Sequence, residues 1–79
     1  MALGLRVGNF AVYVFDERGQ PHHLPHAHIK QRRRRVASVF LLSLEVYDCR
    51  DRLPQALLDE IRKEQDNLLA KWVELNGDD

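Results

Sequence analysis

The side chains best suited to chemistry in this sequence are four histidines within seven residues, His22, His23, His26 and His28. His26 and His28 are two positions apart, so on a strand they point to the same face. Two imidazoles on one face can bind a metal ion if other side chains, such as His22 and His23, complete a tetrahedral set. No Cys-x-x-Cys or His-Glu-x-x-His motif accompanies them. We therefore expect no metal or other cofactor. If a metal ion does bind, we expect these four histidines to be its ligands.

The same histidines could act as acid and base. If the protein is an enzyme, His26 and His28 are the catalytic pair, because imidazole exchanges protons near neutral pH. A ribonuclease is then the best hypothesis, with the nearby arginines holding phosphate. Cys49 is the other candidate nucleophile, but a lone loop cysteine is usually inert. A chain of 79 residues encloses a deep pocket with difficulty, so we expect a non-enzymatic protein.

Four consecutive arginines, Arg32, Arg33, Arg34 and Arg35, form a second cluster. Each arginine that neutralises a phosphate adds a salt-sensitive contribution to nucleic-acid binding. An acidic protein surface, including that of a second copy of this chain, is an equal alternative. The sequence shows neither a helix-turn-helix nor an aromatic platform for bases, which weighs against nucleic acid. The run therefore predicts a charged patch, with nucleic acid as one of two partner classes.

Charge is distributed unevenly along a chain whose formal net charge is zero. Residues 1–50 hold eight Lys or Arg against four Asp or Glu, and residues 51–79 hold four against eight. Such a two-ended chain can offer a basic face to an acidic partner and an acidic helix to a basic one. A sequence pI near 6.9 also means little repulsion between copies, so a homodimer is an expected option.

The hydrophobic pattern predicts the elements that position these residues. Apolar and β-branched runs of strand length predict strands over residues 10–15, 26–31 and 36–47. The third run is either one bulged strand or two strands split near Leu42 and Ser43. The arginine run falls at or near a hairpin turn, although it carries no Gly or Asn to favour one.

A helical period follows over residues 54–76. The helix is expected to start between Asp51 and Pro54, because Asp51 can cap it and Pro54 fits the first turn, and Gly77 suits the C-terminal end. The helix is too long for a small sheet, so a kink or break is expected near residues 65–67. The predicted fold is α+β, with an antiparallel sheet of three to four strands and a C-terminal helix on one face, in one domain over residues 1–79.

Targeting signals are not visible in the sequence. It has no apolar run of membrane-spanning length and no signal peptide. Cys49 is the only cysteine, which fits a reducing compartment. We therefore expect a cytoplasmic protein without a membrane partner.

Two stretches resemble a family of small bacterial proteins catalogued as domain of unknown function 4160. Residues 24–30, Leu-Pro-His-Ala-His-Ile-Lys, resemble its P-P-H-x-H-V strand motif, and residues 66–77 resemble its R-D-x-L-L-x-x-W-x-x-x-H-G helix ending. The strand over residues 10–15 is similar to the family's opening strand. The chain departs from the pattern at Leu24, where the family has proline, at Asn76, where it often has histidine, and at the arginine run, which replaces a Gly-containing hairpin.

The resemblance implies a role for the matched positions. Members of the family are suspected components of toxin–antitoxin-like pairs, so we expect a non-enzymatic interaction module with a protein partner. Pro25, His26 and His28 would shape the partner site, and Trp72 would join the helix to the sheet. The alternative is a small metal- or RNA-handling protein that uses the histidine cluster and the arginine run.

Overall fold

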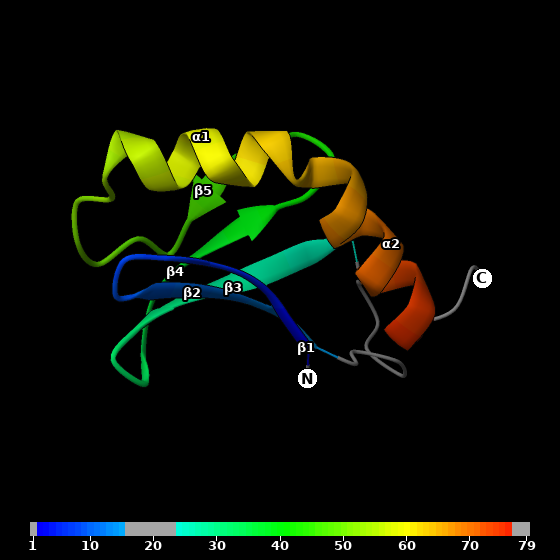
Figure 1. Ribbon diagram of the computed structural model, residues 1–79, viewed down its shortest axis with the longest axis horizontal. Coiled ribbons are helices and arrows are strands. Elements are labelled where there is room, and N and C mark those ends of the chain that lie inside the picture. The colour runs from blue at the N-terminus through cyan, green and yellow to red at the C-terminus, as the bar shows by residue number, and fades with distance from the viewer. Residues whose placement is uncertain (1, 16–23, 77–79) are drawn as a thin grey trace.

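A computed structural model describes residues 2–15 and 24–76, which form one sheet covered by two helices (Figure 1). The strands are β1 (Ala2–Val7), β2 (Phe10–Val14), β3 (His26–Gln31), β4 (Arg34–Phe40) and β5 (Val46–Tyr47). The helices are α1 (Gln55–Lys63) and α2 (Gln65–Asn76). Each strand pairs antiparallel with the next in sequence order. The α+β class is therefore confirmed, with one strand more than predicted.

One face of the sheet carries the core. Cross-strand partners point to the same side of a sheet, and Val12 pairs with Ile29, which pairs with Ala37. All three are fully buried, and both helices lie on this side (Figure 1). The buried cluster also contains Val14, Ala27, Val36, Val39, Leu41, Leu57, Ile61, Leu68 and Trp72. The two helices thus bury one face of the sheet, and no helix formed by residues 2–15 or 24–76 covers the other face.

The sequence analysis missed the first strand. Leu3, Leu5 and Val7 alternate with Gly4 and Arg6, which is a period of two, and Gly8-Asn9 is a favoured two-residue hairpin turn. Gly8 has the positive φ of 59° that such a turn requires. Reading these two signals together would have predicted a hairpin from β1 to β2.

Gly4 sits where β1 comes closest to α2. The pairing of β1 with β2 shifts register between Leu3 and Leu5, so Gly4 is the bulged residue. A Cβ placed on Gly4 would overlap the Cδ2 methyl of Leu68 and lie 3.3 Å from the Val12 carbonyl oxygen. Glycine, usually a weak strand residue, is therefore required here by close helix–strand packing.

We expect Gly4→Ala to lower the free energy of unfolding by about 1 kcal/mol, because the new methyl group overpacks a buried contact. The cost is small because the Leu68 methyl lies at the end of a flexible side chain. Urea unfolding followed by far-UV circular dichroism measures the change. The matched control is Gly8→Ala, whose Cβ has nothing within 4 Å but whose φ is positive. A clash should be relieved by adding Leu68→Val to Gly4→Ala, and no such relief should occur in Gly8→Ala.

The long β-prone stretch over residues 36–47 is split, as one of the two predicted alternatives has it. β4 ends at Phe40, and Leu44 turns the chain with a φ of 64°. The Phe40 amide donates to the Glu45 carbonyl oxygen at 2.9 Å, and the Leu44 amide donates to the Phe40 carbonyl oxygen at 2.8 Å. These two hydrogen bonds hold residues 40–45 in a tight turn between β4 and β5.

The predicted break in the C-terminal helix is confirmed, one residue before the expected range. α1 ends at Lys63 and α2 begins at Gln65. The Gln65 side-chain amide donates to the carbonyl oxygens of Leu41 at 2.6 Å and Leu42 at 3.2 Å. The break is thus anchored to the turn between β4 and β5, which lets α2 change direction and follow the sheet (Figure 1).

The first helix starts within the range predicted for it, but Asp51 does not cap it. The N-cap residue of α1 is Pro54, and no side chain caps the helix. The Asp51 carboxylate instead forms an ion pair with Arg34 at 3.6 Å. A carboxylate three residues upstream of the cap is too far along the chain to reach the first amides. Gly77, the expected C-terminal residue, lies outside the described residues.

Candidate functional site

The sheet face opposite the helices carries a row of basic residues. Arg6 pairs with Ala11, Ala11 with Lys30, and Lys30 with Arg35, so one position from each of four neighbouring strands points to this face. Three of the four are cations, with the small Ala11 between them. We call this set the basic row. Like charges side by side cost free energy unless an anion lies among them, so the row favours an anionic ligand.

Aromatic side chains lie next to the basic row on the same face. Tyr13 pairs with His28, and Phe15 contacts His28 edge-on with ring centroids 4.7 Å apart. The Lys30 Nζ lies 5.3 Å from the centroid of the Tyr13 ring and 5.6 Å from that of Phe15. Each such cation–π contact contributes about 0.5–1 kcal/mol at an exposed site. Lys30, a member of the basic row, therefore also contacts the neighbouring aromatic residues Tyr13 and Phe15.

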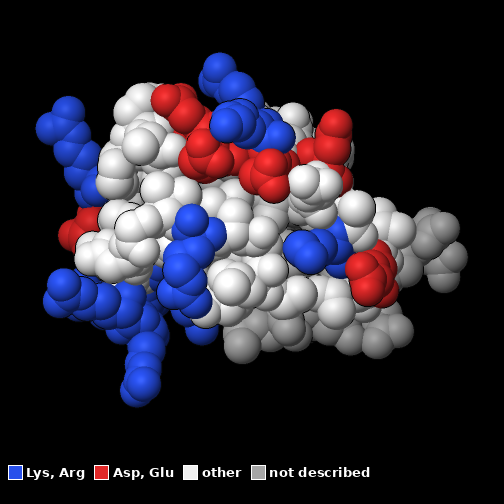
Figure 2. Space-filling view, viewed as in Figure 1, with Lys and Arg blue, Asp and Glu red and all other residues white. Residues whose placement is uncertain are grey.

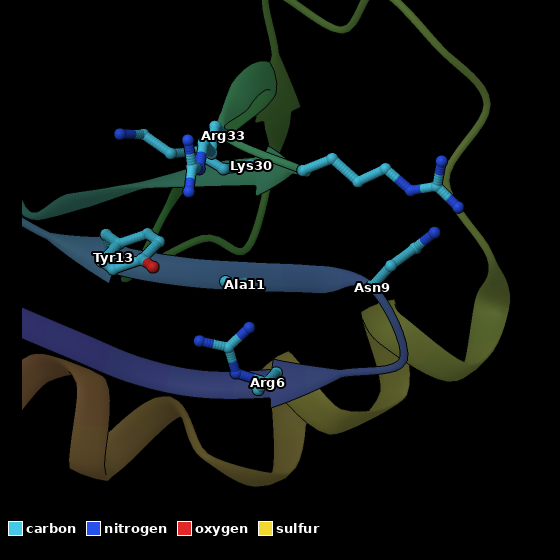
Figure 3. Close-up of a pocket in the computed structure, with 7 residues that line it drawn as sticks. Arg6, Asn9, Ala11, Tyr13, Lys30 and Arg33 are labelled. Atoms are coloured by element: carbon cyan, nitrogen blue, oxygen red, sulfur yellow. The ribbon is translucent and has the colours of Figure 1, made fainter.

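A shallow cavity of about 420 Å³ lies where the basic row meets the aromatic residue Tyr13. Its lining residues are Arg6, Asn9, Ala11, Tyr13, Lys30, Arg32 and Arg33. Figure 3 shows the longer side chains of Arg6, Tyr13, Lys30 and Arg33 around Ala11, which forms the floor. The cavity therefore combines four cations, one aromatic ring and no carboxylate.

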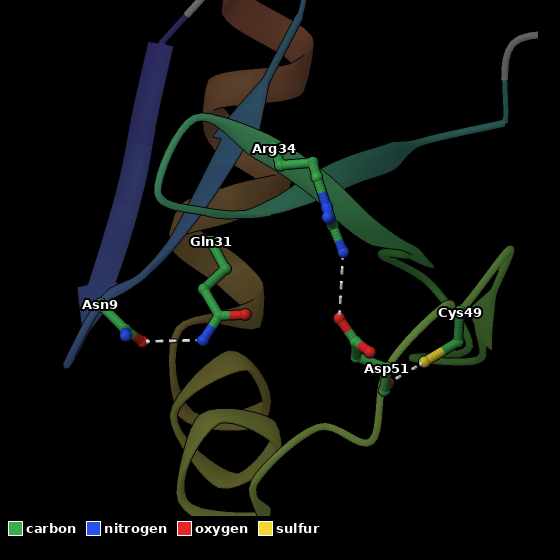
Figure 4. A network of polar contacts seen from close by, with 5 residues as sticks. All are labelled: Asn9, Gln31, Arg34, Cys49 and Asp51. Carbon is green, nitrogen blue, oxygen red and sulfur yellow. Dashed lines mark hydrogen bonds and ion pairs between the residues drawn. The ribbon is translucent and has the colours of Figure 1, made fainter.

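The four arginines of the run do not form one patch. Arg32 and Arg33 are the two central residues of the hairpin turn between β3 and β4, with φ values of 51° and 74°. Arg33 lines the cavity, and Arg35 belongs to the basic row, where its Nη1 donates to the Ser38 hydroxyl at 3.4 Å. Arg34 points the other way, toward Asp51 (Figure 4). The predicted turn is confirmed, and the strands split the charged patch between two sides.

The loop end near the cavity is tied together by side chains. The Gln31 side-chain amide donates to the Asn9 side-chain oxygen at 3.3 Å, which links the turn between β1 and β2 to the end of β3 (Figure 4).

The Cys49 thiol donates to the Asp51 carbonyl oxygen at 2.7 Å. Cys49 therefore takes part in local loop structure, and the described contacts give it no histidine base.

His26 and His28 lie in the first half of β3, away from the arginine turn at its other end. The His26 Nδ1 donates to the Leu24 carbonyl oxygen at 2.9 Å, and its ring lies 5.3 Å from that of His28 and 5.1 Å from that of Trp72. Pro25 accepts a bond from the Leu41 amide at 2.9 Å. These contacts give Pro25 and His26 a structural role in starting β3.

A metal site is not assembled by the described histidines. Among residues 2–15 and 24–76, no three or more His, Cys, Asp or Glu side chains are grouped so that they could hold a metal ion. His22 and His23, the other two expected ligands, lie outside these ranges.

Trp72 joins α2 to the sheet, as its position in the motif suggested. It is 4% exposed and belongs to the core cluster. One turn later, the Asn76 side-chain amide donates to the Phe15 carbonyl oxygen at 3.0 Å and to the Trp72 carbonyl oxygen at 3.1 Å. Asn76, which departs from the family pattern, thus ties the end of α2 to the end of β2.

Charge is separated between the sheet and the helices. Residues 2–15 and 24–44 carry six basic side chains and no acidic one, whereas residues 45–76 carry eight acidic and five basic side chains. Figure 2 shows most of the acidic side chains over the helices, and long basic side chains projecting from the end of the molecule where the β3–β4 turn lies. The asymmetry seen along the sequence is therefore an asymmetry in space.

Comparisons with family models, with curated proteins and with solved structures find no match to this chain. The resemblance to domain of unknown function 4160 therefore stays a prediction. Within the described part of the chain, the helices are too short and too polar to span a bilayer.

The sequence analysis missed most of the cavity. Arg6, Ala11, Tyr13 and Lys30 were not singled out, and the chain was judged to lack an aromatic platform. The signal was present in residues 10–15, an apolar run that was interpreted only as a strand. A period of two puts Tyr13 and Phe15 on the face opposite Val12 and Val14, which are the fully buried pair.

Proposed function

We propose that this protein is a non-enzymatic binding module for nucleic acid, and that the open sheet face holds the phosphate backbone. The observation that carries the proposal is that Arg6 and Lys30 of the basic row line one cavity together with the turn residues Arg32 and Arg33, and that the described lining of this cavity includes no carboxylate. Phosphate contacts of Lys and Arg dominate nucleic-acid affinity. A neutral net charge does not oppose this, because the acidic residues lie mostly over the helices (Figure 2).

The cavity favours binding over catalysis. Its lining residues include no histidine, cysteine or carboxylate. The histidines His26 and His28 instead contact each other and aromatic rings. The proposal keeps the interaction module expected from the resemblance, with nucleic acid as the first ligand, in the cytoplasm. The protein partner of a toxin–antitoxin-like pair remains a prediction of the resemblance alone.

Binding should depend strongly on salt. Each phosphate neutralised on a single strand contributes a slope of about −0.7 to the dependence of log K on log salt concentration. Removing three cations from the cavity as Arg6→Gln, Lys30→Gln and Arg33→Gln should therefore reduce the slope by about 2 and weaken binding tenfold or more. Fluorescence anisotropy of a labelled oligonucleotide at about 50 to 200 mM salt measures both quantities.

The control removes the same charge from the other side of the molecule. Arg52, Arg62 and Lys63 are exposed on or just before α1. Changing all three to Gln alters net charge by the same amount and should leave affinity and salt slope close to those of the unchanged protein. If both triple variants lose affinity equally, only net charge matters and the site is wrong. If the unchanged protein shows no salt-dependent binding, the proposed function is wrong.

A further inference from the structure

We infer that the ligand is single-stranded, with one base held over Ala11 against the Tyr13 ring and its flanking phosphates on Arg6, Lys30 and Arg33. This inference rests on the proposed function and specifies what occupies the cavity. It is carried by the shape and composition of the cavity, whereas the proposed function is carried by charge alone.

The charged groups of the shallow cavity lie around its floor, because the floor is Ala11, which carries no charge. Ala11 has a single methyl group, whereas its cross-strand neighbours Arg6 and Lys30 carry long side chains that rise above it. The volume of about 420 Å³ lies at the small-ligand end of the usual range of about 300–1,000 Å³ for binding pockets. A flat group that enters between the two cations fits this shape, and a nucleic-acid base is flat.

One wall of the cavity is aromatic. Tyr13 is two residues after Ala11 on β2, so its ring rises on the same face, beside the floor. Bases stack on aromatic side chains in proteins that bind single strands, with little preference for sequence. The Lys30 Nζ, 5.3 Å from the centre of this ring, places a cation where the phosphate next to a stacked base would lie.

The base must be unpaired to enter. In a duplex each base is stacked between its neighbours and exposes only its edge in a groove, so no base face is free to stack on the Tyr13 ring. The backbone of the turn bears on the charge of the cavity rim. Arg32 and Arg33 both adopt positive φ, a conformation for which Asn and Gly are preferred. Two arginines at these positions give the rim of the cavity two cations that an Asn-Gly turn would lack.

Filling the cavity without changing its charge tests the inference. Ala11→Leu keeps every cation and adds a side chain where the base would lie, in a residue type that strands tolerate. We expect it to weaken binding of a single-stranded oligonucleotide roughly fivefold to hundredfold, the range for one stacked base, with the salt slope unchanged. Affinity for a duplex of the same length should not change. Ala70→Leu, at an exposed position of α2, is the matched control.

A second pair of variants tests the inference even if Ala11→Leu does not fold. Tyr13→Phe keeps a ring for stacking and should bind as the unchanged protein does, whereas Tyr13→Leu should lose affinity for the single strand. Thermal unfolding followed by circular dichroism confirms that each variant is folded. The oligonucleotides are homopolymers of uridylate and of thymidylate, so that the ribose and deoxyribose forms are tested separately, and the effect must be present in at least one.

The two proposals fail in different ways. If single strand and duplex bind equally and neither Ala11→Leu nor Tyr13→Leu matters, while binding stays salt-dependent, the base is not in the cavity but the proposed function stands. If neither oligonucleotide binds with a salt dependence, the proposed function fails and the inference fails with it.

Discussion

Replacing Trp72 with alanine should lower the free energy of unfolding by about 3–5 kcal/mol, the usual cost of removing a buried tryptophan. The side chain is 4% exposed and lies in the core cluster between α2 and the sheet. Its ring lies 5.1 Å from that of His26, which begins β3. The substitution would therefore loosen α2, and with it the bonds of Asn76 to the end of β2.

The expected loss of stability in Trp72→Ala is a large part of the total stability of the domain. At about 0.05–0.15 kcal/mol per residue, a chain of this length has roughly 4–12 kcal/mol of stability in total. Urea unfolding monitored by far-UV circular dichroism measures the change. Trp72→Phe should recover a large part of the stability. Val73→Ala, at a neighbouring position that is 44% exposed, should cost little. A Trp72→Ala protein as stable as Val73→Ala would show that α2 is not held by this residue.

Replacing the turn residues Arg32 and Arg33 by Asn and Gly should have two opposite effects. Positive φ costs a residue with a side chain roughly 1–2 kcal/mol, and Asn-Gly is the preferred pair for this type of turn. We expect the double variant to be more stable by roughly 1–2 kcal/mol. The gain is smaller than the sum for two residues, because Gly loses more conformational entropy on folding than Arg does. The same variant removes two cations from the rim of the cavity and should bind nucleic acid more weakly.

The experiment measures both quantities on one protein. Thermal unfolding should show a rise in Tm of roughly 4–8 °C for each kcal/mol gained in a domain of this size. Anisotropy with the labelled oligonucleotide should show reduced affinity and a shallower salt slope. The double variant Arg32→Lys with Arg33→Lys keeps charge and backbone strain, so it should be unchanged in stability and close to unchanged in binding. An Asn-Gly variant that binds as tightly as the unchanged protein would remove the turn from the site.

The fold was largely predictable because most of its elements are encoded locally. The apolar run of β2, the split near Leu42 and the break after Lys63 each follow from composition or period. β1 was not predicted, and the close approach of the Leu68 methyl group, which explains Gly4 in this strand, comes from a residue that is remote in sequence. The expected cap by Asp51 does not form for a similar reason, since the partner of Asp51 is Arg34 on another element.

The site was less predictable because it depends on register. Arg6, Ala11 and Lys30 are spread over 25 positions of the sequence, and only the pairing of three strands brings them into line. A shift of one residue would turn each of them to the other face. The run from Arg32 to Arg35 looked like the site because it is contiguous, yet strand alternation sends Arg34 away from Arg35.

The spatial separation of charge has a consequence for how the molecule meets a ligand. A neutral body with cations on its sheet and excess anions on its helices is an electric dipole. In the field of a polyanion a neutral dipolar molecule is mainly rotated and only weakly attracted. It therefore turns until its sheet faces the polyanion. Orientation before contact shortens the search for a productive encounter. Neutralising acids on the helices would raise long-range attraction and, at the same time, reduce the fraction of encounters that arrive with the sheet foremost.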